Sequence, residues 1–375
     1  MAKLQLEMRE ARRLGYQPAL DGVRGIAIAI VVSFHAFGWP RGGTLGVDLF
    51  FVLSGFLITT LLLEEHARSG RISLRGFYFR RARRLLPALF ALLAPFLLLG
   101  VLTAALTGSF PGSLFLGVGG ALTYTSNIIT AADPRAMPAA LIHLWSLAAE
   151  EQFYIVWPPL LILLIRRGGL RLLGRALGVL LVVAILYRLQ LSLRGASLER
   201  IYYGPDTHPD SLLVGCAFGC YFVRGRLPWI ISSERARKVS ITVALVAVVA
   251  TAVLLGRVPM GLARETQLVG TAFAIAAGVL VVCAALGGSA VARALGVRPL
   301  VFLGQISYSV YLWHLPLLVA CAGLHREIGL RTVAAVAATV VVATGSRHFV
   351  ELPFLARRAK ARVEPGQTVA GVAAA

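Results

Sequence analysis

The stretch ALDGVRGIAIAIVVSFHAFGW, residues 19–39, decides how this chain is built. It is long enough to cross a bilayer as one helix, because about 20 predominantly apolar residues span the hydrocarbon layer. Arg24 and His35 both lie inside it. Their spacing puts them on one helix face, about 16 Å apart along the axis. Ionisable side chains at membrane depth are costly, so this pair predicts a functional site.

The composition excludes a soluble globular protein. The chain has 375 residues, of which 58% are hydrophobic, and its mean hydropathy is +0.78. Its formal net charge of +20 comes without a nucleic-acid-binding motif. Membrane proteins hold Lys and Arg in their cytoplasmic loops, so we assign the charge to those loops and expect no nucleic-acid partner. Basic loops also attract membrane lipids with anionic headgroups.

Apolar runs recur along the whole chain. We expect membrane spans at residues 22–38, 45–63, 87–107, 146–165, 176–192, 209–223, 239–256, 267–287, 300–322 and 332–350. One more apolar run, 112–130, is interrupted by glycines and ends in polar residues, so we expect it to be re-entrant or interfacial. The predicted fold is therefore an all-α, polytopic helical membrane protein with about 10 transmembrane helices and one re-entrant or interfacial segment.

Basic residues then orient the chain. When the interrupted run does not cross, the arginine-rich segment 64–84 and both termini fall on the cytoplasmic side. The same arrangement puts His143 and Glu150 near the outer face, opposite that segment. We expect a multi-pass protein of the cell membrane with both termini cytoplasmic. Its membrane domain is predicted over residues 1–355, followed by a short, disordered cytoplasmic tail over 356–375.

A second candidate site is the segment GFYFRRARRLLPALF, residues 76–90. Arg81 and Arg84 are three positions apart and therefore adjacent on one helix face. Guanidinium groups suit bidentate recognition of phosphate. From charge alone, a cytoplasmic anchor is the favoured alternative. Because Arg24 lies at the same membrane surface, we predict an anionic ligand that enters from the cytoplasm.

The segment HLWSLAAEEQFYIVWP, residues 143–158, brings a carboxylate to a membrane span. Ser146, Glu150 and Tyr154 share one helix face, whereas Glu151 points about 100° away. A carboxylate entering a span is a functional candidate. The residues leave open which of the two glutamates matters.

Two aspartates lie near ends of predicted spans. Asp48 either pairs with His35 or binds substrate, and an unremarkable interfacial helix cap is equally favoured. Asp210 either contacts a polar acceptor or caps its helix, again with equal weight.

Other polar residues have simpler interpretations. We interpret His314 as a structural histidine in preference to a second base. Arg347 and Glu351 are four positions apart on one helix and are expected to pair. No residues with metal-ligand spacing appear in the sequence, so we predict no metal site.

In this order, the segments resemble the acyltransferase-3 family of integral membrane acyltransferases. The resemblance runs from Ala19 to about Phe354 and rests on four motifs. These are the Arg24–His35 pair, GVDLFFVLSGFLIT at 46–59, the Arg80, Arg81 and Arg84 block, and WSLAAEEQFY at 145–154. The family includes enzymes that O-acetylate bacterial surface polysaccharides and acylate lipids or macrolide sugars. The resemblance implies one helical membrane domain, an essential Arg24–His35 pair, and an arginine motif, Arg81 and Arg84, that faces acyl-CoA.

The predicted activity is O-acyl transfer, with acetyl as the favoured group, from cytoplasmic acyl-CoA to a hydroxyl of a carbohydrate, glycolipid or macrolide-type acceptor. His35 is expected to act as general base or acyl carrier, and Glu150 to orient His35 or bind the acceptor. Acyl-CoA is a co-substrate, and no permanently bound cofactor is expected. The candidate CoA-binding residues are Arg24, Arg81 and Arg84, and the candidate substrate-binding residues are Asp48, Ser146, Tyr154 and Asp210.

Two other classes of function compete. The first is a proton-coupled transporter of a lipid-linked sugar or organic acid, since polar residues in spans suit a proton relay equally well. The second is a membrane scaffold, which has no need for Arg24 and His35 at depth on one face. Many family members add an extracytoplasmic hydrolase-like domain, whereas this chain has about 25 residues after its last predicted span. We therefore expect the transfer step either here or on a separate extracytoplasmic transferase.

Overall fold

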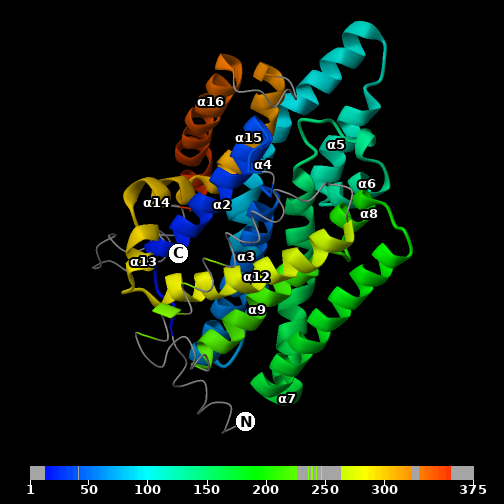
Figure 1. The fold of residues 1–375 in the computed structure, drawn as a ribbon. Helices are drawn as coiled ribbons and strands as arrows, with labels where there is room; N and C mark the ends of the chain where they lie inside the picture. Colours follow the sequence, from blue (N-terminus) through cyan, green and yellow to red (C-terminus); the bar gives the residue numbers. More distant parts are fainter. Residues whose placement is uncertain are drawn as a thin grey trace.

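The computed structural model describes residues 13–40, 42–225, 263–322 and 329–355, with single positions between 235 and 246. Every regular element in these ranges is helical, which confirms the all-α prediction (Figure 1). The α-helices, with the 3-10 helix η1 and the π-helical turn η2, are α2 (Pro18–Phe37), α3 (Leu45–Ser69), α4 (Leu74–Thr107), α5 (Gly112–Leu122), α6 (Ser126–Ala132), η1 (Pro134–Ala136), α7 (Leu144–Leu193), α8 (Leu198–Tyr203), α9 (Pro209–Val223), α12 (Ala263–Leu286), α13 (Ala290–Leu295), α14 (Arg298–Gln305), α15 (Ser307–Ala322), α16 (Leu330–Ser346) and η2 (Arg347–Glu351).

The helices confirm a polytopic membrane protein. In the described part, α2, α3, α4, α7 and the run from α16 through η2 are long and apolar enough to cross a membrane. Shorter apolar helices accompany them, among them α5, α9 and α15. Large apolar side chains on the outside of α4, α7 and α16 are exposed, as expected for surfaces that face lipid. The predicted span at 239–256 and the predicted tail at 356–375 lie outside the described ranges.

The two spans predicted at 146–165 and 176–192 correspond to the two arms of α7. The arms meet at Gly169, whose φ of 64° and ψ of −160° interrupt the helix. Only glycine adopts such a conformation readily, since it carries no Cβ. Figure 1 shows the chain reversing direction there, so that the arms form a helical hairpin.

The interrupted run at 112–130 forms two short helices, α5 and α6. The chain breaks between them at Tyr124, which has a φ of 53°. Gln152 on α7 stabilises the break, because its amide nitrogen donates to the Tyr124 carbonyl oxygen at 2.7 Å. Its amide also exchanges hydrogen bonds with that of Asn127, at 3.1 and 2.9 Å. Non-helical backbone at membrane depth requires such protein partners, so the geometry fits the expected re-entrant segment.

Glycines bring two pairs of helices into close contact. A Cβ added to Gly55 of α3 would lie 2.1 Å from the carbonyl oxygen of Leu212, and one added to Gly215 of α9 would lie 2.1 Å from that of Val52. Small residues let membrane helices approach this closely. A Cβ on Gly304 of α14 would likewise lie 1.8 Å from a backbone oxygen of α2. The contact with α14 fixes α2, and with it Arg24 and His35, against its neighbour.

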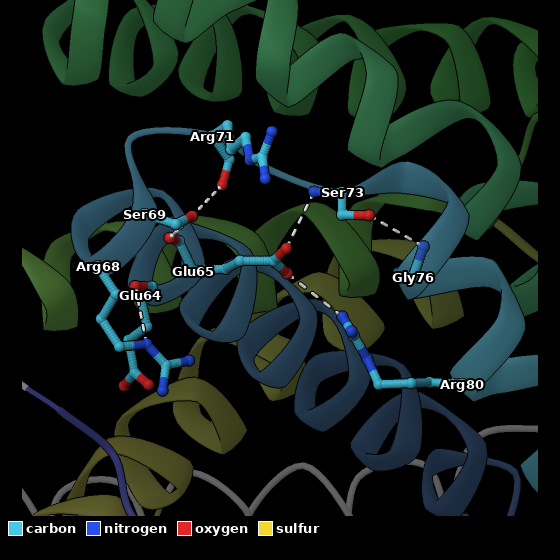
Figure 2. Close-up of polar contacts among 8 residues, drawn as sticks. All are labelled: Glu64, Glu65, Arg68, Ser69, Arg71, Ser73, Gly76 and Arg80. Atoms are coloured by element: carbon cyan, nitrogen blue, oxygen red, sulfur yellow. Dashed lines mark hydrogen bonds and ion pairs between the residues drawn. The ribbon is translucent and has the colours of Figure 1, made fainter. Parts of the chain in front are cut away.

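The arginine-rich segment predicted as a loop at 64–84 is mostly helical, because α3 continues to Ser69 and α4 begins at Leu74. Glu65 braces the short turn between them (Figure 2). Its carboxylate accepts a hydrogen bond from the Ser73 backbone N–H at 2.9 Å and pairs with Arg80 at 3.3 Å. Ser73 caps α4, because its hydroxyl accepts from the Gly76 N–H at 3.1 Å. Arg81 and Arg84 are therefore held on a continuous helix that enters the bundle.

Candidate active site

Two groups of polar side chains lie between the helices. The arginine group consists of Arg24, Arg81, Arg84 and Arg347, together with their partners Asp21, Glu151, Glu351 and Tyr154. The histidine group consists of His35, His143, His314, Tyr311 and Ser146. Helix α2 contributes to both groups through Arg24 and His35, and α7 does so through its first three turns. The two groups are therefore built partly on the same two helices, α2 and α7.

Arg81 links α4 to α7. Its guanidinium pairs with the Glu151 carboxylate at 3.2 Å and lies over the Tyr154 ring, 3.5 Å from its centroid. Tyr154 donates its hydroxyl hydrogen bond to Glu150, which also accepts one from Ser54. Glu151 therefore balances the charge of Arg81, whereas Glu150 accepts hydrogen bonds from the hydroxyl groups of Tyr154 and Ser54.

These contacts contradict the predicted position of Glu150 relative to the arginine-rich segment. The sequence placed Glu150 opposite the arginine-rich segment, at the other membrane face. That prediction is wrong, because its neighbour Glu151 is ion-paired with Arg81. The start of α7 is buried, since His143, Leu144 and Trp145 are at most 5% exposed, so α7 begins inside the bundle instead of at its surface.

Arg84 differs from the other arginines of its segment. Arg80 pairs with Glu65, and Arg83 donates to the Phe354 carbonyl oxygen at 2.7 Å. Arg84 is exposed, and the described part of the chain offers it no hydrogen-bonded or ion-paired partner. Within the described part of the chain, the charged groups that act on it most strongly are three arginines, Arg24, Arg81 and Arg347, followed by the Glu351 carboxylate. This is the electrostatic environment that attracts an anion.

The other two arginines of the group have one carboxylate each. Arg24 pairs with Asp21 at 3.2 Å. Arg347 pairs with Glu351 at 3.1 Å, which confirms that prediction. Glu351 also accepts a hydrogen bond from Ser309 on α15 at 2.5 Å. The π-helical turn that holds Arg347 and Glu351 is of a kind often found at functional sites. Sequence reasoning missed Arg347 as a site residue, although an arginine within a span was a signal for it.

The histidine group joins α2, α7 and α15. His314 Nε2 lies 3.3 Å from His35 Nδ1, and their ring centroids are 5.1 Å apart. The His143 centroid lies 5.0 Å from that of His314. Tyr311 completes the group, since its hydroxyl donates to the His143 carbonyl oxygen and lies 2.6 Å from the Ser146 hydroxyl. His314 was interpreted as a structural histidine in preference to a second base, and that interpretation stays a prediction; the structure brings it against His35, the residue expected to do the chemistry.

The two aspartates form a separate network. The buried side chains of Asp210 and Arg188 are joined by hydrogen bonds of 3.1 and 2.9 Å, and Thr271 donates to Asp210 at 2.7 Å. Asp48 accepts from Ser211 at 2.7 Å. The alternative that Asp48 pairs with His35 is therefore not the arrangement found, and roles for Asp48 and Asp210 in substrate binding stay predictions. The described residues contain no group of three or more side chains arranged to hold a metal ion.

Known proteins are similar to most of this chain. A family model described as an acyltransferase domain, Acyl_transf_3, matches residues 17–346. The chain is 34% identical over 358 residues to a protein of Bacillus subtilis named putative peptidoglycan O-acetyltransferase YrhL, covering 90% of this chain and 55% of that protein. It is 31% identical over 359 residues to the peptidoglycan O-acetyltransferase OatA of Listeria monocytogenes, covering 90% of this chain and 56% of the relative.

A third relative, O-acetyltransferase OatA of Staphylococcus aureus, is 30% identical over 318 residues, covering 81% of this chain and 51% of that protein. The chain therefore spans about half the length of these curated relatives. No solved structure matches it.

Proposed function

This chain belongs to the acyltransferase-3 family, and from that premise we propose that it transfers an acetyl group from cytoplasmic acetyl-CoA to a hydroxyl group of a cell-wall glycan. The glycan is proposed because the relatives at 34% and 31% identity are named peptidoglycan O-acetyltransferases. The observation that carries the proposal is the pairing of an arginine group with a histidine group along α2. The arginine group suits the phosphates of CoA, and the histidine group suits the thioester end of acetyl-CoA.

The arginine group supports an anionic donor. Among the described residues, the charged groups that act most strongly on Arg84 are three arginines, ahead of one carboxylate, so a bound phosphate relieves repulsion between guanidinium groups as well as pairing with Arg84. Arg24, Arg81 and Arg347 already have carboxylate partners. We assign the phosphates of CoA to Arg84 first, and we expect Arg24, Arg81 and Arg347 to line the same phosphate site. Guanidinium forks match phosphate oxygens in charge and geometry.

The distance between the groups suits a CoA thioester. Arg24 and His35 are separated by about 16 Å along α2, and the pantetheine arm of CoA is a long chain between its phosphates and its sulfur. With the phosphates at Arg84 and Arg24, the thioester lies toward His35. Ion pairs with Asp21 and Glu151 keep the guanidinium groups of Arg24 and Arg81 in place.

The chemical step needs a base, because an alcohol is a poor nucleophile until its proton is removed. His35 takes the hydroxyl proton while the alcohol oxygen attacks the thioester carbonyl carbon. The carbon–sulfur bond breaks, an ester bond forms, and the proton passes from His35 to the CoA thiolate. In the covalent variant of the proposal, His35 carries the acetyl group before the hydroxyl receives it. The alternative, that a separate extracytoplasmic transferase passes the acetyl group to the final acceptor, stays a prediction.

The test uses purified protein in lipid nanodiscs with acetyl-labelled acetyl-CoA and soluble peptidoglycan fragments. Wild type is expected to move label to the fragments, and His35→Ala to lose this transfer. His66→Ala, a histidine at the end of α3, is the matched control. A parallel experiment in sealed proteoliposomes follows movement of labelled glycan. Glycan movement without turnover of acetyl-CoA would favour the transporter, and neither movement nor turnover would favour a scaffold.

A further inference from the structure

The hydrogen bonds of the histidine group determine which ring nitrogens carry protons. His314 Nδ1 lies 2.6 Å from the Tyr311 carbonyl oxygen. A carbonyl oxygen only accepts hydrogen bonds, so this nitrogen carries the proton. The His314 side chain is fully buried, at 0% exposure, and burial favours the neutral ring. A neutral imidazole has one lone pair, which therefore lies on His314 Nε2.

That lone pair faces His35. His35 Nδ1 lies 3.3 Å from His314 Nε2 and 3.0 Å from the Val31 carbonyl oxygen. Both neighbours accept, so His35 Nδ1 carries a proton and donates it. In neutral His35 the lone pair is then on Nε2, the nitrogen on the far side of the ring. A base needs an available lone pair, so the contacts with Val31 and His314 together select the atom that acts.

The neighbouring ring, His143, restrains this arrangement. Its Nε2 lies 3.2 Å from the Leu312 carbonyl oxygen, which makes it the protonated nitrogen. Its Nδ1 is buried and has no hydrogen-bond partner among the residues that the structure describes. The ring stands at 77° to that of His314, and Tyr311 lies beside both. His314 is thus packed between rings and cannot turn without displacing them.

We propose that His314 is a positioning residue for the acyl transfer: it holds His35 in the tautomer whose Nε2 takes the proton of the acceptor hydroxyl. The inference rests on the proposed function. When His35 Nε2 receives that proton the ring becomes cationic, and the hydrogen bond from Nδ1 to His314 becomes charge-assisted and stronger. An interaction that strengthens as charge develops lowers the barrier. His314 acts here as an orienting acceptor behind a catalytic histidine, a role that carboxylates fill in other enzymes.

Two substitutions separate this role from simple packing. His314→Phe keeps a ring of similar shape and removes both nitrogens. His314→Gln loses the ring but retains an acceptor oxygen that reaches the region of Nε2. A packing role predicts that the Phe variant is the more active, whereas positioning predicts that the Gln variant is. For His314→Phe we expect kcat to fall about a hundredfold or more, within the range for loss of general base catalysis, with KM for acetyl-CoA little changed.

The experiment combines these kinetics with nitrogen NMR of histidine-labelled protein in nanodiscs. The His35 signals are assigned by their loss in His35→Ala. Wild type is expected to show His35 protonated at Nδ1, and His314→Phe to show an added population protonated at Nε2, because the Val31 carbonyl oxygen then holds the Nδ1 proton without His314. His66→Phe is the control and is expected to leave both the activity and the His35 signals unchanged.

Each outcome decides a separate point. A wild-type His35 protonated at Nε2, or a Phe variant at least as active as the Gln variant, would overturn the inference. Failure of the wild type to transfer acetyl groups would instead refute the proposed function, and the NMR spectra would still report whether His314 sets the His35 tautomer. If His314→Phe does not fold, the wild-type spectrum and the Gln variant decide.

Discussion

Arg81 of α4 and Glu151 of α7 form an ion pair of 3.2 Å, and both side chains are largely buried. The two residues are 70 positions apart in the chain. The pair ties the helix that carries the arginine motif to the helix that carries Ser146 and Tyr154. It also distinguishes the two neighbouring glutamates, because Glu150 accepts hydrogen bonds from hydroxyls instead.

From this pair we predict that Glu151→Gln weakens donor binding. The change removes the counter-charge that orients Arg81, and KM for acetyl-CoA is expected to rise about tenfold, equivalent to about 1.4 kcal/mol. Once Arg81 is replaced by Gln, the Glu151 change is expected to add little, because residues in one ion pair act together. Steady-state kinetics of the two single variants and the double variant check this. Independent, multiplicative effects on KM would contradict it.

Arg84→Gln is expected to reduce affinity for acetyl-CoA more than Arg80→Gln. Both changes remove one positive charge from the same helix. Arg80, however, has a partner in Glu65 at the exposed turn (Figure 2), whereas Arg84 faces other arginines. Titration calorimetry with acetyl-CoA at low and high salt gives the measurement. The Arg84 variant should also lose part of the salt dependence, since it lacks a phosphate contact. Equal affinities for the two variants would remove Arg84 from the donor site.

Asp210→Asn is predicted to destabilise the protein. Arg188 and Asp210 are 7% and 2% exposed, and breaking a buried pair leaves an uncompensated charge, which costs about 3–5 kcal/mol. The paired change Arg188→Leu with Asp210→Leu should be milder, because no unpaired charge remains. Thermal unfolding in detergent compares the variants. An Asp210→Asn protein that is stable but inactive would instead support the predicted contact with the acceptor.

Gly215→Ala is expected to loosen the contact between α3 and α9. The added methyl group would lie 2.1 Å from the Val52 carbonyl oxygen, so the two helices must separate. Gly178→Ala on α7 is the matched control, since a Cβ there meets nothing within 4 Å. Alanine favours helix over glycine by about 1 kcal/mol, so the control should be neutral or stabilising. A shift of the melting temperature in the same direction for both variants would contradict the packing argument.

The sequence by itself determined what lies within one helix. Arg24 and His35 are placed on α2 by a fixed rise and rotation per residue, and the Arg347–Glu351 pair follows from its spacing of four. The spans could be recognised because backbone in lipid must satisfy its own hydrogen bonds, which makes long apolar helices obligatory. The break in the run at 112–130 was likewise visible in its glycines and polar end.

The tertiary structure alone decided which helices meet. His314 contacts His35 across 279 positions, and Arg81 contacts Glu151 across 70. Nothing in a single sequence specifies such partners, since an apolar side chain that faces lipid resembles one that faces protein. Partner choice depends instead on close backbone contacts spread along the chain, such as those of Gly55 and Gly215. Spacing within a helix is a local property, whereas the pairing of histidines, and of arginine with glutamate, belongs to the assembled bundle.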